Sequence, residues 1–179
     1  MRLLRILAFS LLTVPCALAT PQNSQVPAVV LPPVTAYALD RAKVTLPADF
    51  ATPFNLLILS FQRDQESVVD GWLPVVPSET RSRVQTWLLP ISQRENGVYR
   101  WWLNASLRGS QAASQPRRYT VPLYVDKAKF LRALQVYSEQ DVVILLTDRG
   151  GHVVWRSSGP LTDGKKADLN NFLLKLPPR

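Results

Sequence analysis

The fold of this chain is decided by the stretch LLILSF at residues 56–61. A continuous apolar run of this length predicts a β-strand that is buried on both faces, as in sheets covered by helices. Apolar residues then return at i, i+3, i+4 and i+7, the spacing of one helical face (Val69, Trp72, Leu73 and Val76). The stretch 84–91 predicts a second strand, and the helical spacing recurs after it (Val98, Trp101, Trp102 and Ala105).

The rest of the chain continues this alternation. We expect a third strand at 119–125, where Pro122 is tolerable only at an edge or an irregular position. Asp126 can then cap a helix with one apolar face (Phe130, Leu131 and Leu134). Strands at 142–146 and 153–156 flank the sequence DRGG, which predicts a hairpin turn with positive φ. A terminal helix has its own apolar face (Leu169, Phe172, Leu173 and Leu176), and a short hairpin of 34–39 and 43–46 precedes all these elements.

This order of elements predicts an α/β domain. Helices between successive strands imply parallel pairing, and the closing hairpin adds an antiparallel edge to the sheet. We therefore expect a mixed central sheet in a single domain over residues 34–176, followed by a tail at 177–179. Residues 20–33 contain four prolines and several small polar residues, so we expect an extended linker there.

The first nineteen residues have the features of a secretory signal peptide. Arg2 and Arg5 give a positive end, 6–14 form a mostly apolar run, and the sequence ALA at 17–19 predicts cleavage after Ala19. The run is shorter than the roughly 20 apolar residues that a permanent spanning helix needs. We expect export to the periplasm or the exterior; a retained anchor and an organellar transit peptide are the alternatives.

Composition excludes several classes of function. The chain has 179 residues with a formal net charge of +8, and it contains 1 Cys and 1 His. A single cysteine excludes a disulfide scaffold or a thiolate zinc cluster, and a single histidine argues against an imidazole-rich metal site. Glycine-rich phosphate loops and the GxSxG and HExxH motifs are absent. We expect no metal and no cofactor, and cleavage of the leader would remove the only thiol, Cys16.

The pattern resembles the thioredoxin-like superfamily in its peroxiredoxin-type elaboration, over roughly residues 45–176. The carrying stretches are 56–61, which leads into a helix, and VVILLTDRGGHVVW at 142–155, which is similar to the strand, Asp, charged residue, Gly and strand that end such proteins. SFQR at 60–63, together with 120–125 and 150–159, is most similar to the assembly-factor family of the mitochondrial ATP synthase. The resemblance implies a three-layer sandwich and a role in assembling a membrane complex.

Two parts of the redox machinery of that superfamily are missing. Redox members carry a thiol in the loop after the first core strand, where a helix N-terminus lowers its pKa. Here the loop reads QRDQE at 62–66, without cysteine. The family also places a cis-proline before the strand that faces this loop, and here EQD at 139–141 precedes Val142. We therefore expect no thiol-disulfide oxidoreductase or peroxidase activity.

The candidate partner-binding residues fall into three places. Arg63, Asp64, Glu66 and Trp72 lie at the former redox position, Trp101 and Trp102 are adjacent, and Arg117 and Arg118 lie in a polar loop. Acidic residues at a helix start are also what the helix dipole favours. Adjacent tryptophans on a helix point about 100° apart, so either both are core residues or one faces a partner or a membrane surface.

We expect a non-catalytic binding or assembly factor for a protein partner. The mitochondrial factors act on the matrix side, whereas this chain is expected to be exported, so the resemblance does not carry over the client. No nucleic acid is expected, because the basic residues are scattered among acids in an exported chain. Two alternatives remain: an enzyme that uses carboxylates such as Asp64 and Asp70, and an envelope protein that binds a ligand or an anionic surface (through Arg100, Arg108, Arg117 and Arg118).

Overall fold

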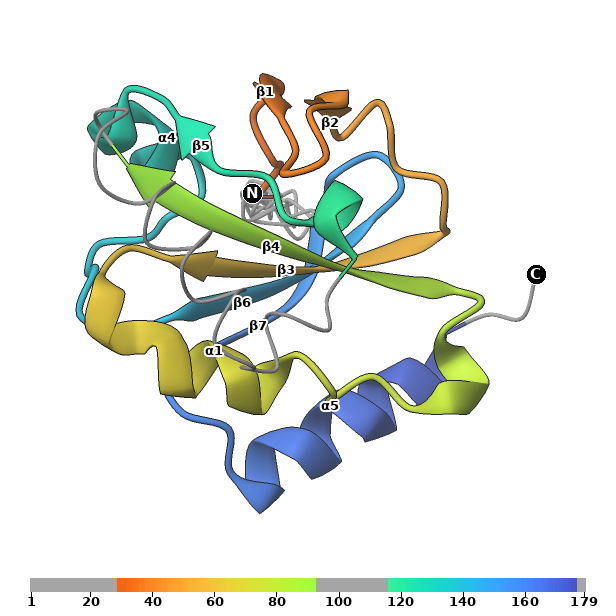
Figure 1. Ribbon diagram of the computed structural model, residues 1–179. Helices are drawn as coiled ribbons and strands as arrows, with labels where there is room; N and C mark the ends of the chain where they lie inside the picture. The colour runs from red at the N-terminus through yellow and green to blue at the C-terminus, as the bar shows by residue number, and fades with distance from the viewer. Residues whose placement is uncertain (1–28, 93–115, 177–179) are drawn as a thin grey trace, which may run out of the picture.

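The computed structural model describes residues 29–92 and 116–176, and its centre is a five-stranded sheet (Figure 1). The strand order is β5-β4-β3-β6-β7. The strands are β3 (Phe54–Ser60), β4 (Val84–Ser92), β5 (Leu123–Tyr124), β6 (Val143–Asp148) and β7 (Val153–Ser158). β3 pairs parallel with β4, and β4 with β5, whereas β6 is antiparallel to both β3 and β7. The expected mixed sheet is confirmed, and the strand expected at 56–61 lies at its centre as β3, with bounds Phe54–Ser60.

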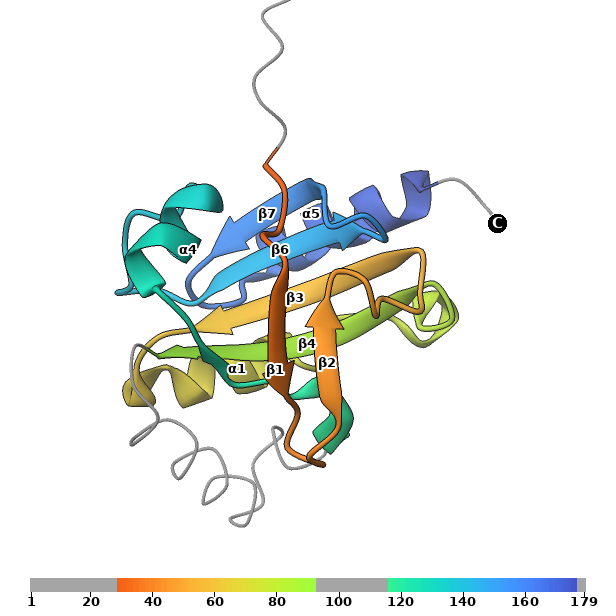
Figure 2. The same ribbon diagram turned by 90° about the horizontal axis from the view of Figure 1, so that it is seen from above.

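Two layers cover the sheet. Helices α1 (Glu66–Trp72) and α5 (Asp163–Lys175) lie on one face. The hairpin of β1 (Val34–Tyr37) and β2 (Lys43–Leu46) and helix α4 (Lys127–Ala133) lie on the other (Figure 2). Successive side chains of a strand point to opposite faces. Leu56 and Ile58 accordingly pack with the α1 and α5 side, Leu57 and Leu59 pack with the hairpin side, and none of the four is exposed.

The structure contains the helix cap and the tight turn that the sequence predicts. The Asp126 carboxylate accepts a hydrogen bond from the Lys129 N–H at 3.1 Å and caps α4, as expected. The turn between β6 and β7 places Gly151 at φ 85°. A Cβ atom there would lie 2.9 Å from Cγ of Pro47, so both the dihedral angle and the close approach require glycine.

The structure corrects four details of the sequence prediction. α1 ends at Trp72, so Val76 is buried in the loop that follows and not on a continued helix. The third strand is reduced to β5, because a short 3₁₀-helix, η3 (Arg117–Tyr119), and Pro122 precede it. β6 runs antiparallel to β3 although α4 lies between β5 and β6. Leu31, assigned to the linker, is 1% exposed and belongs to the core.

The expected helix at 98–105, the expected signal peptide, most of the expected linker and the expected tail lie outside the described residues. Within residues 29–92 and 116–176, no helix is both long enough and apolar enough to cross a membrane.

Candidate functional site

The site that the fold singles out is the connection between β3 and α1. The chain leaves β3 at Ser60, passes through Phe61 and Gln62, forms a short 3₁₀-helix, η1 (Arg63–Gln65), and enters α1. The Gln65 side chain folds back over this turn. Its Oε1 atom accepts hydrogen bonds from the N–H groups of Phe61 at 2.8 Å and Gln62 at 3.2 Å, which closes the loop on itself.

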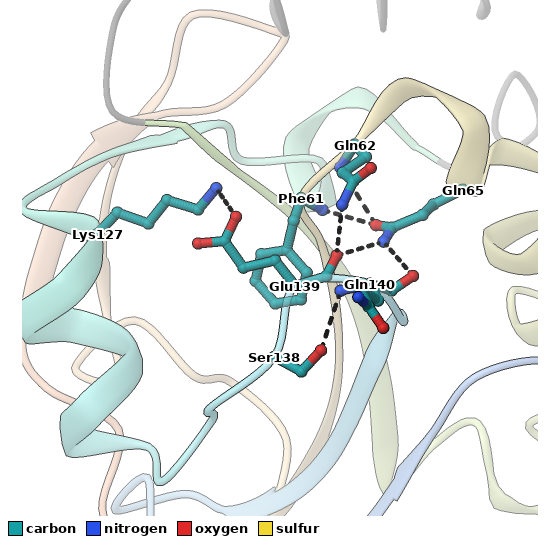
Figure 3. A network of polar contacts seen from close by, with 7 residues as sticks. All are labelled: Phe61, Gln62, Gln65, Lys127, Ser138, Glu139 and Gln140. Atoms are coloured by element: carbon teal, nitrogen blue, oxygen red, sulfur yellow. Dashed lines mark hydrogen bonds and ion pairs between the residues drawn. The ribbon is translucent and has the colours of Figure 1, made fainter.

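The other end of the Gln65 amide reaches the segment that precedes β6 (Figure 3). Its Nε2 atom donates to the carbonyl oxygens of Glu139 at 2.8 Å and Gln140 at 3.2 Å. Gln62 Nε2 donates to the same Glu139 carbonyl at 3.0 Å. These two glutamines therefore join the two segments where the redox proteins that the sequence resembles carry their thiol and their cis-proline.

The amide of Gln65 has no hydrogen-bonding capacity left. A primary amide offers two N–H donors and two oxygen lone pairs, and all four are used within the protein. The residue is also 5% exposed. Gln65 is thus a buried structural bridge, and a ligand would have to break existing bonds to reach it.

A charged rim completes this edge of the molecule. Lys127, the first residue of α4, forms an ion pair with Glu139 at 2.5 Å and lies 5.7 Å from the ring centre of Phe61. The Glu139 side chain is 41% exposed, so the ion pair contributes at most about 1 kcal/mol. Its main effect is to hold the start of α4 against the same segment that the glutamines bind.

The structure separates the residues that the sequence analysis placed at this edge. Asp64 is exposed and Glu66 is half-buried at the start of α1, while the side chain of Arg63 lies outside the described atoms. Trp72 is fully buried, donates its Nε1 hydrogen to the Gly159 carbonyl at 2.9 Å and packs edge-on against Trp155. Its assignment to a partner surface is therefore wrong; Trp72 is a core residue.

The remaining candidates do not join this site. Trp101 and Trp102 lie outside the described residues. Arg117 and Arg118 are exposed in η3, which contacts the amino-terminal half of β4 through the Tyr119 and Trp87 rings. The Gln65 loop lies at the other end, since Ser60 pairs with Pro90 (Figure 1). The described residues contain no group of three or more His, Cys, Asp or Glu that could hold a metal.

Sequence reasoning missed the residues that organise the edge, namely Gln65, Lys127, Glu139 and Gln140. A signal was present, because polar residues stand at both positions where the redox machinery is missing. The sequence did not reveal that side chains at the first position donate hydrogen bonds to backbone carbonyls at the second.

Comparisons with solved structures match this fold. No protein-family model and no curated protein matches the chain. A thiol:disulfide interchange protein from Bacteroides sp. matches with a TM-score of 0.60 at 19% identity, over 82% of this chain and 90% of its own. The exposed lipoprotein thioredoxin from Streptococcus pneumoniae strain TIGR4 matches with a TM-score of 0.53 at 12% identity, over 81% and 100%. BsSco, a member of the Sco family of cytochrome c oxidase assembly proteins, matches with a TM-score of 0.52 at 11% identity, over 84% and 96%.

The chain therefore has the thioredoxin-like fold, with the α/β layers that the sequence predicted. Its structural neighbours are thiol-disulfide oxidoreductases and related proteins. They give no support to the closer relationship with ATP synthase assembly factors that the sequence resemblance implied.

Proposed function

We propose that this protein is an exported binding or assembly factor that uses the thioredoxin-like fold without thiol chemistry. The observation that carries the proposal is the saturated amide of Gln65 at the helix start. The redox members of the superfamily that the sequence resembles carry a thiol in this loop, where a helix N-terminus lowers its pKa. A primary amide is neither a nucleophile nor a redox group, and here it holds two segments of the scaffold together.

The distribution of sulfur supports the same conclusion. Residues 29–92 and 116–176 contain no cysteine, and the one cysteine of the chain, Cys16, lies in the expected signal peptide. Thiol–disulfide exchange requires an attacking thiolate. Cleavage after Ala19 leaves the mature chain without one.

A rigid edge of this kind suits protein binding. Gln62 and Asp64 are exposed on a loop whose backbone is fixed by the bonds of Gln65 and by the contact with the segment before β6. A surface that is already ordered loses less conformational entropy when a partner binds. The Sco structural neighbour belongs to a family of cytochrome c oxidase assembly proteins, which illustrates the fold in an assembly role.

The proposal is tested by site-specific photo-crosslinking in the native envelope. A photoreactive amino acid replaces Asp64 in the full chain, and a matched sample carries it at Lys166, which is exposed on α5. We expect a defined protein adduct from position 64 that is absent from position 166.

An assay with the purified protein tests the proposed absence of thiol–disulfide exchange. The full chain and its Cys16→Ser variant are compared in a disulfide-reduction assay with insulin. We expect neither to turn over substrate. Cys16-dependent turnover, or the absence of any adduct specific to position 64, overturns the proposed function.

A further inference from the structure

A second surface lies around the turn of the β1–β2 hairpin. The Leu39 N–H donates to the carbonyl oxygens of Arg117 at 3.2 Å and Thr120 at 3.0 Å, which fixes η3 beside this turn (Figure 2). Two chain segments far apart in the sequence thereby bring four exposed cations to one region, namely Arg41 and Lys43 from the hairpin and Arg117 and Arg118 from η3.

The charges of this cluster are not used inside the described protein. Within residues 29–92 and 116–176, no salt bridge joins any of these four cations to a carboxylate; the contacts Lys127–Glu139 and His152–Asp148 lie elsewhere. Arg118 stacks over the Tyr119 ring at 5.7 Å, which orients its guanidinium without neutralising it. Arg41 has φ 70° in the turn, a conformation that glycine adopts at lower cost.

A pocket of about 410 Å³ opens beside Lys43 and Arg118. The aromatic rings of Trp87 and Tyr119 line it, in edge-to-face contact at 5.1 Å. Trp87 is held from behind, since it packs 5.7 Å from Phe50 and donates its Nε1 hydrogen to Asn55 Oδ1 at 2.9 Å. The volume lies within the roughly 300–1,000 Å³ of ligand pockets, and the wall is preformed.

The pocket also contains one acid, Asp49. Its Oδ2 atom accepts a hydrogen bond from the Thr45 N–H at 2.6 Å, which holds the carboxylate against β2. Lys43 and Arg118 therefore outnumber the acid at the pocket. In the neighbouring turn, Arg41 and Arg117 outnumber one further acid, Asp40, whose Oδ1 atom accepts a hydrogen bond from the Ala42 N–H at 3.0 Å. The expected ligand is anionic and carries an apolar group.

We propose that this pocket binds an acidic segment of a protein partner, with one apolar side chain in the pocket and flanking carboxylates on the four cations. The pocket lies apart from the Gln65 loop, so it adds a second contact for a protein partner, and the proposal rests on the proposed function. The chain itself does not supply the segment: of its 13 acidic residues only Glu95 lies outside the described residues, whereas Arg94, Arg100 and Arg108 lie there with it.

The pocket does not favour a nucleic acid base. Single-strand binding depends on bases that stack on open aromatic faces. Trp87 is only 4% exposed, and the face of Tyr119 is covered by the Arg118 guanidinium. An anionic membrane would meet the exposed cations but would leave the recessed Trp87 wall without a role.

Fluorescence anisotropy of a labelled peptide tests the proposal on the full chain. The probe has a central phenylalanine flanked on each side by three acidic residues. We expect saturable binding that weakens about tenfold or more for the double variant Lys43→Gln/Arg118→Gln. A double variant of exposed lysines elsewhere, Lys129→Gln/Lys166→Gln, removes two charges as well and is expected to bind within about twofold of the wild type.

Three further arms separate the alternatives. A peptide with alanine in place of the phenylalanine, and a peptide with glutamines in place of the acids, are each expected to bind several-fold more weakly. Phosphatidylglycerol vesicles are expected to bind no better to the wild type than to the Lys43→Gln/Arg118→Gln variant. Three results would each overturn the proposal. The peptide does not bind, or the two double variants lose equal affinity for it, or vesicle binding depends on Lys43 and Arg118. A partner adduct from position 64 without peptide binding leaves the proposed function standing and this inference refuted.

Discussion

The side chain of Gln65 and the carbonyl of Glu139, 74 positions apart in the chain, are joined by a 2.8 Å hydrogen bond. This bond connects the start of α1 to the segment before β6. A buried amide that is fully hydrogen-bonded stabilises the scaffold but offers no reactive group.

Replacement of Gln65 tests the structural part of this account. Gln65→Ala removes the acceptor for the buried Phe61 N–H and the donors for two carbonyls, and a buried unsatisfied group costs roughly 1–3 kcal/mol. We expect a loss of about 2–4 kcal/mol in the free energy of unfolding, measured by urea denaturation. Gln62→Ala is the control. It removes from an exposed side chain the donor to the Glu139 carbonyl and the acceptor for the Gln65 N–H, and it is expected to cost less than Gln65→Ala, about 1 kcal/mol.

The pH dependence of Gln65→Glu provides a sharper test. The substitution replaces the donating nitrogen with an oxygen that faces the Glu139 and Gln140 carbonyls, which disfavours a charged carboxylate. The pKa of the introduced carboxyl is then higher in the folded state than the unfolded value of about 4.3. We expect the full destabilisation at neutral pH and a smaller one as the pH falls through the folded-state pKa. A destabilisation that grows on acidification relative to the wild type contradicts this arrangement.

Trp72 belongs to the core, and its replacement is expected to affect folding. The ring is fully buried, and a Trp→Ala change at such a site costs about 3–5 kcal/mol. Trp72→Phe keeps most of the ring but leaves the Gly159 carbonyl without its donor, so we expect an intermediate loss. Thermal denaturation monitored by circular dichroism measures both. Wild-type stability of Trp72→Ala would show that the side chain is not packed as described.

The turn before β7 gives a backbone prediction. Gly151→Ala places a Cβ at φ 85° and 2.9 Å from Pro47, and we expect a loss of about 1–3 kcal/mol. Gly164→Ala, in α5, meets only Oγ1 of Thr162 at 4.0 Å and is expected to stabilise the protein by up to about 1 kcal/mol. Opposite signs in urea denaturation support the described turn, and equal effects contradict it.

The leader gives a prediction that needs no variant. Mass spectrometry of the N-terminus of the protein purified from the cell envelope is expected to find Thr20 as the first residue, and hence no cysteine in the mature chain. If the mature protein still carries Cys16, the argument that it lacks a thiol no longer holds, although the hydrogen bonds of Gln65 would be unchanged.

Local features of the fold could be predicted from the sequence. The burial of LLILSF on both faces of the sheet, the Asp126 cap and the Gly151 turn each follow from a few neighbouring residues. Each feature is determined by the residues of one strand, one helix end or one turn. It could therefore be predicted without knowing which distant segments pack against it.

The site could not be predicted in the same way. Trp72 has helical spacing whether it faces the core or a partner, and only the approach of Gly159 and Trp155 decides. The bond between Gln65 and Glu139 depends on how β6 aligns beside β3. Arg41 and Arg118 likewise come to one region of the surface only because the hairpin turn lies against η3. Each of these relationships joins segments that lie far apart in the sequence.

The most direct test of the central claim is photo-crosslinking from position 64 in cells that carry the Cys16→Ser substitution in the same chain. If the protein acts by binding without thiol chemistry, the same adduct is recovered in the same yield with and without Cys16. If the adduct disappears in Cys16→Ser, or if a reducing agent releases the captured protein, the partner is held through sulfur and the account is contradicted.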